Sequence, residues 1–356
     1  MTAMLNLAAM TGFASDNNAS VHPAVLAALT SVNDGHVVAY GDDRYTKRCN
    51  AQFEQLFGRS VEVLLVWGGT GANVVALGSL LQASQAVICS RHAHINVDEG
   101  GAPERIIGTK LIDVASDDGK ITPEQVAGEL HAIGNPHHAQ PKVVSITQST
   151  ELGAVYQPSE IAAISEVAHA HGLLVHMDGA RIANATASLR CDIRDITVGA
   201  GVDVVSFGGT KNGMMYGEAV VFLTPGLAGS AQYIRKQFTQ LPSKARYIAA
   251  QFEALLTDGL WLQTAGHANA MAQRLHVGIT GVAGIDPGPA PQANALFPRL
   301  PRRAIIELQR AWRFYDWDVH THQVRWMTSW DTTVETVDAF LADVRSIATV
   351  GAIAID

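Results

Sequence analysis

The chain has 356 residues, 47% of them hydrophobic and 16% charged, so it can bury a large core and form two domains. Its formal net charge is −8 and it has no run of lysine or arginine, which excludes the basic surface typical of proteins that bind nucleic acid or anionic membranes. The start lacks a basic segment and no apolar stretch reaches about eighteen residues, so we expect neither an export signal nor a membrane span.

Three cysteines are widely spaced along the chain, at Cys49, Cys89 and Cys191. An odd number without a CxxC pair favours reduced, buried thiols over a disulfide framework. We therefore expect a cytoplasmic protein.

Between about residues 62 and 223, short apolar runs alternate with longer amphipathic segments. Seven runs rich in β-branched residues predict strands: VEVLLVWGG, QAVICS, KLIDV, KVVSIT, GLLVHMD, VDVVSFGG and EAVVFL. The segments between them, such as PSEIAAISEVAHAHG, carry apolar residues at helical spacing and end in glycine. This alternation predicts an α/β protein with a mainly parallel sheet covered by helices on both faces, whose ligands bind at the carboxyl ends of the strands.

The second half of the chain has a different character. A helical region is predicted from about residue 231 to residue 274, and a Gly- and Pro-rich break follows it. Short strands and helices with many aromatic residues then predict a smaller α+β domain. We predict a large domain over residues 1–245, with an N-terminal segment over residues 1–20, and a small C-terminal domain over residues 246–356.

The loop WGGTGAN, residues 67–73, follows a predicted strand and opens a helix. Its glycines allow a ligand to approach the backbone, and the free N–H groups of a helix start favour an anion such as phosphate. A helix capped by the side chain of Thr70 is the alternative. The loop matches neither GxGxxG nor a P-loop, so we expect neither a dinucleotide nor a nucleoside triphosphate.

Asp178 ends the predicted strand GLLVHMD and is followed by Gly179, Ala180 and Arg181. Its carboxylate either caps the next helix or is held for a cationic ring or a metal ion. No set of further ligands at metal-binding spacing accompanies it, so we expect no metal.

Lys211 lies in a short polar loop between two predicted buried strands, within SFGGTKNGMMYGEAVVFL. Burying a lysine is costly unless its amine is used, and a surface turn is the alternative. Together with Asp178 and the phosphate-type helix start, Lys211 matches what pyridoxal 5'-phosphate requires. The lysine forms the Schiff base, the aspartate pairs with the pyridinium nitrogen and the helix start holds the phosphate.

These residues resemble the threonine aldolases, which belong to the fold type I group of pyridoxal phosphate enzymes. The resemblance covers most of the chain and is carried by FASDN, YGDD, GTGAN, AHINVDEGG, HMDGARI, the lysine loop, NALF and QVRWMTSWD. The form SFGGTKNG is similar to the branch that contains the pseudomonad low-specificity L-threonine aldolases and phenylserine aldolases. The family implies a large domain with a seven-stranded sheet and a smaller C-terminal α+β domain.

The resemblance also implies roles for individual residues. The catalytic roles fall to Lys211, His94 and Asp178. Cofactor binding falls to Gly69, Thr70, His94, Asp178, Arg181 and Lys211. Substrate binding falls to Ser15, Tyr40, Arg181 and Arg325, and a guanidinium suits the substrate carboxylate. Tyr40 and Asp43 lie in a segment that contributes, in the family, to a site shared between subunits, which implies a homodimer or homotetramer.

One position departs from the family pattern. Many members have a second active-site histidine in a Thr-His-Asn-Gly stretch, where this chain reads STELG with Glu151 or its neighbour at that place. The acid–base role of that histidine therefore does not transfer, and the group that takes the β-hydroxyl proton is open. Our hypothesis is that His94 takes it.

The resemblance implies a carbon–carbon lyase that cleaves L-threonine, allo-threonine or L-phenylserine to glycine and an aldehyde. The alternatives are an aminotransferase, racemase or β-eliminating lyase of the same fold, or a non-enzymatic phosphate-binding module. Trp67 and Phe207 hint at an aromatic pocket, although such residues are more often part of a core.

Overall fold

The structure is a computed structural model that describes residues 12–352. It consists of two compact units. Ser20–Gln263 form the larger unit, and the described residues 12–19 and 264–352 form the smaller one. None of the described helices is long and apolar enough to cross a membrane.

This division differs from the boundary predicted at residue 245, because it lies inside helix α10 (Leu260–Ile279). Helix α9 (Arg246–Leu256) contacts the first two helices of the larger unit and so belongs with them. At the N-terminus, the backbone N–H of Phe13 donates to the carbonyl of Arg313, which ties this segment to the smaller unit. As a description of folding domains, the boundary at residue 245 stays a prediction.

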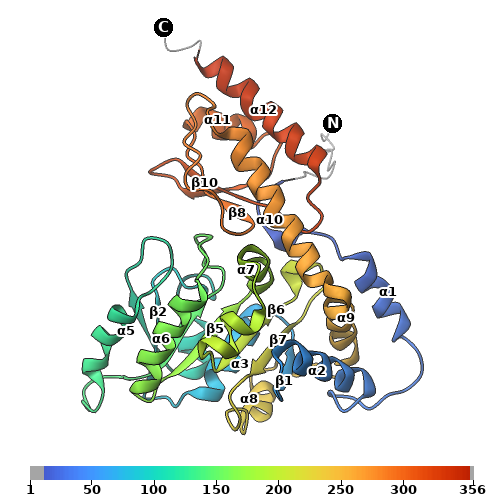
Figure 1. Cartoon of the computed structure of the whole chain (residues 1–356), viewed down its shortest axis with the longest axis vertical. Helices are drawn as coiled ribbons and strands as arrows, with labels where there is room; N and C mark the ends of the chain where they lie inside the picture. Colours follow the sequence, from blue (N-terminus) through green and yellow to red (C-terminus); the bar gives the residue numbers. More distant parts are fainter. Residues whose placement is uncertain (1–11, 353–356) are drawn as a thin grey trace, which may run out of the picture. The chain divides into compact units, whose positions relative to one another are not determined.

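The larger unit contains the predicted seven-stranded sheet (Figure 1). Its strand order is β1-β7-β6-β5-β4-β2-β3, and β7 runs antiparallel to both of its neighbours while the other pairs are parallel. The strands are β1 (Glu62–Val66), β2 (Gln85–Ser90), β3 (Lys110–Val114), β4 (Gln140–Thr147), β5 (Leu174–Gly179), β6 (Val204–Gly208) and β7 (Glu218–Phe222). The predicted α/β class and the mainly parallel sheet are thus confirmed.

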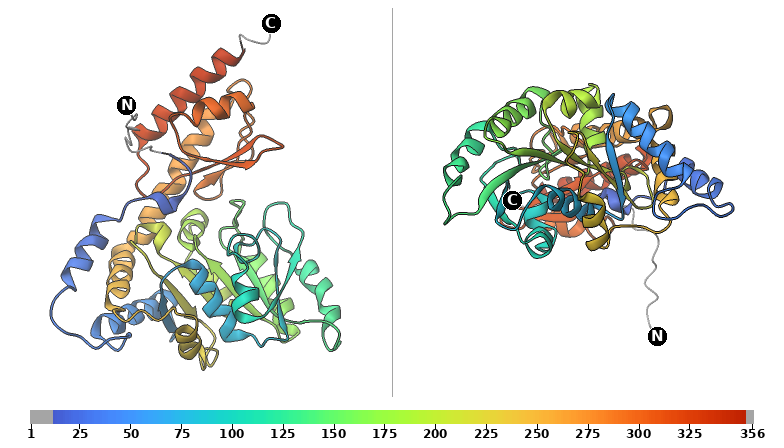
Figure 2. Two further views of the ribbon diagram at one scale, coloured as in Figure 1. Left: turned by 180° about the vertical axis from the view of Figure 1, so that it is seen from behind. Right: turned by 90° about the horizontal axis from the view of Figure 1, so that it is seen from below.

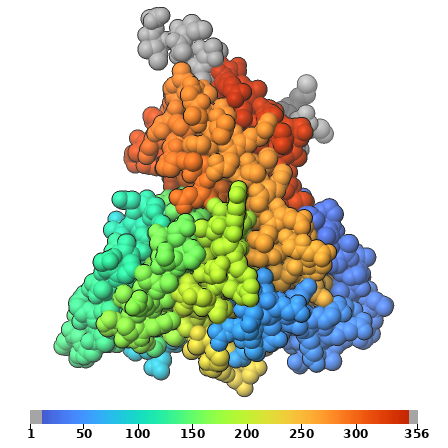
Figure 3. All heavy atoms as spheres, viewed as in Figure 1, coloured from blue at the N-terminus to red at the C-terminus, as the bar shows by residue number. Residues whose placement is uncertain are grey.

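Helices cover the sheet (Figures 1 and 2). They are α1 (Pro23–Ser31), α2 (Arg44–Phe57), α3 (Gly69–Leu80), α4 (His94–Val97), α5 (Pro123–Glu129), α6 (Pro158–Ala170), α7 (Ile182–Leu189), α8 (Ala231–Gln237) and α9. Helix α3 is apolar around its whole circumference, as expected of a buried helix, and it packs on β5, β6 and β7. Helix α6, in contrast, contributes to the outer surface visible in Figure 3.

Local sequence signals set the ends of these helices. Asp43 is the N-cap of α2, and its carboxylate accepts hydrogen bonds from the backbone N–H groups of Tyr45 and Thr46. The same helix ends at Gly58, whose φ of +65° favours glycine. The buried carboxylate of Asp43 is therefore used to start α2.

The smaller unit has a three-stranded antiparallel sheet of order β8-β10-β9, formed by Ala295–Leu296, Gln323–Met327 and Tyr315–Asp318. Helices α11 (Arg302–Leu308) and α12 (Val334–Ala352) complete it together with the end of α10. Its core is aromatic and centres on Trp326, which packs on Phe340 and Phe314. The predicted smaller α+β part is confirmed.

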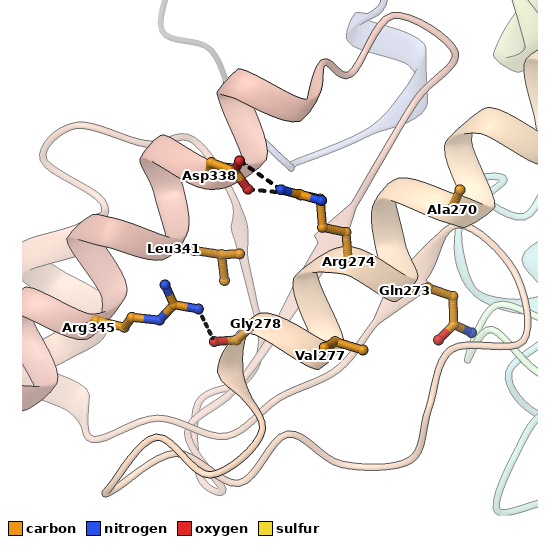
Figure 4. Close-up of a pocket in the computed structure, with 8 residues that line it drawn as sticks. All are labelled: Ala270, Gln273, Arg274, Val277, Gly278, Asp338, Leu341 and Arg345. Carbon is orange, nitrogen blue, oxygen red and sulfur yellow. Dashed lines mark hydrogen bonds and ion pairs between the residues drawn. The ribbon is translucent and has the colours of Figure 1, made fainter.

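A cavity of about 700 Å³ lies between α10 and α12 (Figure 4). An ion pair between Arg274 and Asp338, with N···O distances of 2.7 Å, crosses it, and the guanidinium of Arg345 donates to the carbonyl of Gly278. None of the predicted site residues lines this cavity.

Candidate active site

The larger unit gathers most of the predicted site residues at one edge of its sheet. Strands β1, β2, β4, β5 and β6 run in the same direction, because β1 and β6 are both antiparallel to β7. The loops that follow these strands therefore meet at their carboxyl ends. At this edge lie Asp178 at the end of β5 and the segments that follow the strands, with Gly69 and Thr70 after β1, His94 after β2, Glu151 after β4, Arg181 after β5 and Lys211 after β6.

Asp178 is buried at the end of β5, next to Ser206 of β6 in the sheet register. One carboxylate oxygen accepts from the backbone N–H of Ala180 at 3.0 Å and the other from Nδ2 of Asn73 at 2.7 Å. Helix α7 begins only after Arg181, its N-cap residue, so the alternative in which Asp178 caps that helix is wrong. Its carboxylate is instead fixed by two donors on different elements.

A buried histidine lies below Asp178 on the same strand. His176 points to the same face of β5, since side chains alternate along a strand, and it is hydrogen-bonded to Ser145 at 2.9 Å and Ser206 at 3.0 Å. Burial lowers the pKa of His176 to about 4, although the charge of Asp178 opposes this shift. His176 is therefore neutral near pH 7 and places no cation beside Asp178.

A chain of polar side chains connects Asp178 to His94. Nδ2 of Asn73 also donates to Oε1 of the buried Glu99 at 2.8 Å, and the same oxygen lies 2.9 Å from Nδ1 of His94. The hydrogen bond to Glu99 raises the pKa of His94; the charge of Asp178 adds to this, whereas burial and the charge of Lys211 oppose it. The network fixes the ring of His94 and favours its protonated form.

Glu151 contacts the same histidine from the loop after β4. Its Oε1 accepts from the backbone N–H of His94 at 2.8 Å, which places a carboxyl group at the start of α4. Its Oε2 is buried and has no hydrogen-bond partner among the described residues. Burial and the charge of Asp178 raise the pKa of Glu151 to about 7, so a large fraction of this carboxyl group is protonated near neutral pH.

Helix α3 starts without a side-chain cap. Its N-cap is Gly68, which has no side chain to offer, and Thr70 lies inside the first turn, so the alternative in which Thr70 caps the helix is wrong. The first backbone hydrogen bond of the helix runs from Ala72 to the carbonyl of Gly68. A Cβ at Gly68 or Gly69 would meet no atom within 4 Å, so the space beside the backbone of these two glycines is open.

Lys211 lies on a short 3-10 turn, Thr210–Asn212, directly after β6. Glycines allow the tight packing around this turn, since a Cβ at Gly208 would lie 2.4 Å from the carbonyl oxygen of Ala180. The backbone N–H of Gly209 donates to Oε2 of Glu218 at 2.5 Å. The side chain of Glu218, the first residue of β7, therefore fixes the backbone at the start of this turn.

Two predicted substrate-binding residues lie together in the smaller unit. Nη2 of Arg325 donates to the carbonyl of Ala14 at 2.9 Å. Ala14 directly precedes Ser15 in the chain. The rings of Tyr315 and Trp317 flank the guanidinium carbon at 5.4 and 5.1 Å. Ser15 caps a short turn by accepting from the N–H of Asn17.

Tyr40 lines a cavity of the larger unit that none of the other predicted site residues lines. It is half exposed and has a φ of +63°, and Arg235 and Lys236 also line this cavity of about 580 Å³. Lys236 lies over its ring, with the ammonium nitrogen 5.3 Å from the ring centre.

Trp67 and Phe207, the two residues that suggested an aromatic pocket, differ in their exposure to solvent. Phe207 is fully buried in a cluster with Phe53 and Phe252 and is a core residue. Trp67, in contrast, is 44% exposed and stacks on Tyr216, with ring centres 5.6 Å apart.

The residues present fit pyridoxal phosphate. Asp178 is a fixed buried carboxylate, the start of α3 is free to receive a phosphate, and Lys211 follows the next strand in the sheet. Within residues 12–352, no group of three or more His, Cys, Asp or Glu side chains is arranged to hold a metal ion.

Sequence reasoning missed Asn73, Glu99 and Glu218. The first two lie inside GTGAN and AHINVDEGG, but Asn73 bonds to Glu99 and Asp178, which are 26 and 105 residues away in the sequence. Glu218 opens an otherwise apolar strand, and an acidic residue at such a position is the signal that was available.

Comparison with protein families agrees with this geometry. The family model of the beta-eliminating lyases matches residues 12–299. The low specificity L-threonine aldolase of Pseudomonas sp. strain NCIMB 10558 is 42% identical over 337 residues, which cover 94% of this chain and 97% of that protein. The enzyme of the same name from Pseudomonas aeruginosa is also 42% identical, with the same coverage.

A solved structure is similar over nearly the whole chain. The threonine aldolase of Leishmania major superimposes with a TM-score of 0.90 at 30% identity, covering 95% of this chain and 99% of that one. A β-eliminating lyase or threonine aldolase from Exiguobacterium, at 18% identity and a TM-score of 0.74, shares the fold.

Proposed function

Because this chain belongs to the beta-eliminating lyase family and to its threonine aldolases, we propose that it cleaves L-β-hydroxy-α-amino acids to glycine and an aldehyde. The observation that carries the proposal is the common sheet edge at which Lys211, Asp178, His94 and the open start of α3 meet. An aminotransferase, racemase or β-eliminating reaction on the same fold is the alternative.

We propose pyridoxal 5'-phosphate as the cofactor. Bound to this site, it would supply an electron sink for the pair released when a bond at Cα breaks. Lys211 would attach it, and Asp178 would face its ring nitrogen, with Asn73 fixing one carboxylate oxygen. The backbone of Gly69 and Thr70 would hold the phosphate, and Arg181 would lie near the cofactor and the substrate carboxylate.

The remaining roles concern the amino-acid substrate. Arg325, beside Ser15, binds the α-carboxylate, and the hydrogen bond to Ala14 supports a fixed orientation of its guanidinium. His94 takes the proton of the β-hydroxyl group as the Cα–Cβ bond breaks. The hydroxyl oxygen becomes the aldehyde carbonyl, and a proton added at Cα completes glycine. Because the hydrogen bond to Glu99 raises the pKa of His94, the neutral ring that can accept this proton is populated at a higher pH than in a free histidine.

We also propose a cellular compartment, an oligomeric state and a preferred aldehyde product for this protein. Cys49, Cys89 and Cys191 are free thiols, which supports a reducing compartment such as the cytoplasm. The separate cavity around Tyr40 supports a homodimer or homotetramer whose sites are shared. The exposed pair of Trp67 and Tyr216 supports an aromatic aldehyde, and hence phenylserine as a substrate.

Aldehyde release tests the reaction. We expect the purified protein with pyridoxal phosphate to release benzaldehyde from L-threo-phenylserine or acetaldehyde from L-threonine, and the ratio of the two kcat/KM values identifies the preferred aldehyde. Lys211→Ala should abolish both activities together with the borohydride-fixed cofactor. Formation of a keto acid or of the D-amino acid, with no aldehyde, would contradict the proposal.

A further inference from the structure

Glu218 is a buried carboxyl group that contacts the N-cap residue of the lysine turn, Thr210–Asn212. It is the first residue of β7, which runs antiparallel to β6 and so begins at the edge where the site lies. The sheet register places it between Val66 of β1 and Gly208 of β6, and it is only 7% exposed. A charged residue type at such a position requires a partner.

Its first partner is the backbone of the lysine turn. Gly209 is the N-cap of the turn Thr210–Asn212 and has no side chain that could cap it. Oε2 of Glu218 accepts from the N–H of Gly209 at 2.5 Å and takes this role from the neighbouring strand. Because the turn is short, the position of Gly209 determines where the next residues lie, Lys211 among them.

Its second partner is the charge of Lys211. Burial raises the pKa of Glu218 to about 7, and four groups oppose this rise: the N–H of Gly209, the hydroxyl and backbone of Thr210, and the charge of Lys211. Among the titratable groups of the surrounding elements, Asp178 ends β5 on the far side of β6, Tyr216 lies two residues before Glu218, and Arg235 of α8 donates to the carbonyl of Leu65 on β1. The carboxylate binds the backbone N–H of Gly209, two residues before Lys211, and the charge of this lysine acts on it.

We propose that Glu218 is the positioning residue of Lys211: it fixes the turn that presents the lysine and supplies the counter-charge of its ammonium group. The inference rests on the proposed function, because it takes Lys211 as the residue that attaches pyridoxal phosphate. It adds a residue from β7 to a site otherwise built from loops after parallel strands.

The counter-charge has a chemical consequence. In the attachment, the nitrogen of Lys211 bonds to the aldehyde carbon of pyridoxal phosphate, and the two hydrogens of the neutral amine leave with the aldehyde oxygen as water. The ammonium form has to lose its extra proton first. A carboxylate near the ammonium favours the protonated form, so Glu218 holds the attachment reaction at a higher pH than an uncharged residue would.

Glu218→Gln separates the two roles. The amide oxygen still accepts from Gly209, but the charge is gone. Cofactor-free wild type and Glu218→Gln are mixed with pyridoxal phosphate between pH 6 and 9, and borohydride-fixed cofactor is measured by mass spectrometry against time. We expect the pH profile of the attachment rate to move to lower pH in Glu218→Gln, while the Kd for pyridoxal phosphate stays within about threefold of wild type.

Glu218→Ala tests the positioning role, and Glu62→Gln is the matched control. Glu218→Ala leaves the N–H of Gly209 without its acceptor, so we expect about a tenfold weaker Kd for pyridoxal phosphate. Glu62 is the first residue of β1 and is exposed, so its replacement should change neither the Kd nor the pH profile.

Two results would overturn the inference: a pH profile of Glu218→Gln that superimposes on wild type, or a wild-type Kd in folded Glu218→Ala. If Glu218→Ala does not fold, the profile of Glu218→Gln decides. The proposed function fails differently, since an enzyme that attaches the cofactor normally but releases no aldehyde contradicts the reaction and leaves the role of Glu218 standing.

Discussion

At the scale of single residues, the site depends on carboxyl groups that are buried without a full set of partners. Glu151 is one of them: burial raises its pKa to about 7, and its Oε2 has no hydrogen-bond partner in the described part of the chain. In the unfolded chain the same group ionises near pH 4.5. Folding therefore works against ionisation of Glu151, and this cost is absent at pH 4, grows as the pH rises and is complete above pH 7.

We predict that Glu151→Gln stabilises the cofactor-free protein at pH 8 but not at pH 4. Glutamine keeps the acceptor for the N–H of His94 and has no charge to bury, so the gain at pH 8 is on the order of 1 to 3 kcal/mol. Urea unfolding at the two pH values measures it. The exposed Glu166 of α6 offers a control, since Glu166→Gln should have no such effect. Equal stability of Glu151→Gln and wild type at pH 8 would contradict the raised pKa.

Some of these residues could be predicted from the sequence, whereas the hydrogen bonds between them could not. Lys211 and Asp178 were predictable because each follows a recognisable apolar run and each has a residue type that the cofactor requires. The link from Asp178 through Asn73 and Glu99 to His94 was not, because it joins β5, α3 and the segment after β2, which are far apart in the sequence. A hydrogen bond between distant residues leaves no periodic pattern in the sequence.

At the scale of secondary structure, the strands were predictable because seven β-branched runs are bounded by turn residues. The antiparallel direction of β7 was not, since a short buried run reads the same in either direction. That direction is what brings Glu218 to the active edge. The start of α3 was predicted as one of two alternatives, and the position of Gly68 as N-cap rules out the one in which Thr70 caps the helix.

We predict that Gly69→Ala weakens cofactor binding without weakening the fold. A Cβ at this position meets no protein atom within 4 Å, and alanine suits the first turn of a helix, so the midpoint of thermal unfolding should stay the same or rise. The methyl group would occupy the space through which a phosphate approaches the N–H groups, so the Kd for pyridoxal phosphate should rise about tenfold or more. Gly128→Ala, in the exposed part of α5, is the control because its Cβ also meets no atom. A wild-type Kd for Gly69→Ala would place the phosphate elsewhere.

At the scale of the whole molecule, the predicted site residues are distributed over the two units. Lys211, Asp178 and His94 belong to the larger unit, whereas Ser15 and Arg325 belong to the smaller one. The division into units places residues 12–19 in the smaller one, where the backbone N–H of Phe13 contacts Arg313, and no local sequence pattern reveals such a contact. Tyr40 lines a cavity of the larger unit, and none of the other predicted site residues lines it.

The position of Tyr40 in this cavity leads to a prediction about assembly. If Tyr40 completes the site of a second copy of the chain, Lys211→Ala and Tyr40→Ala remove different halves of one shared site, and each homo-oligomer should be inactive or nearly so. Mixing the two variants under conditions that exchange subunits should then restore about a quarter of the wild-type aldehyde release, because half of the dimers are hybrids with one intact site of two. Lys211→Ala mixed with wild type gives the exchange control. Activity that does not rise above the sum of the separate variants, with exchange verified by mass spectrometry, would mean that Tyr40 serves its own subunit.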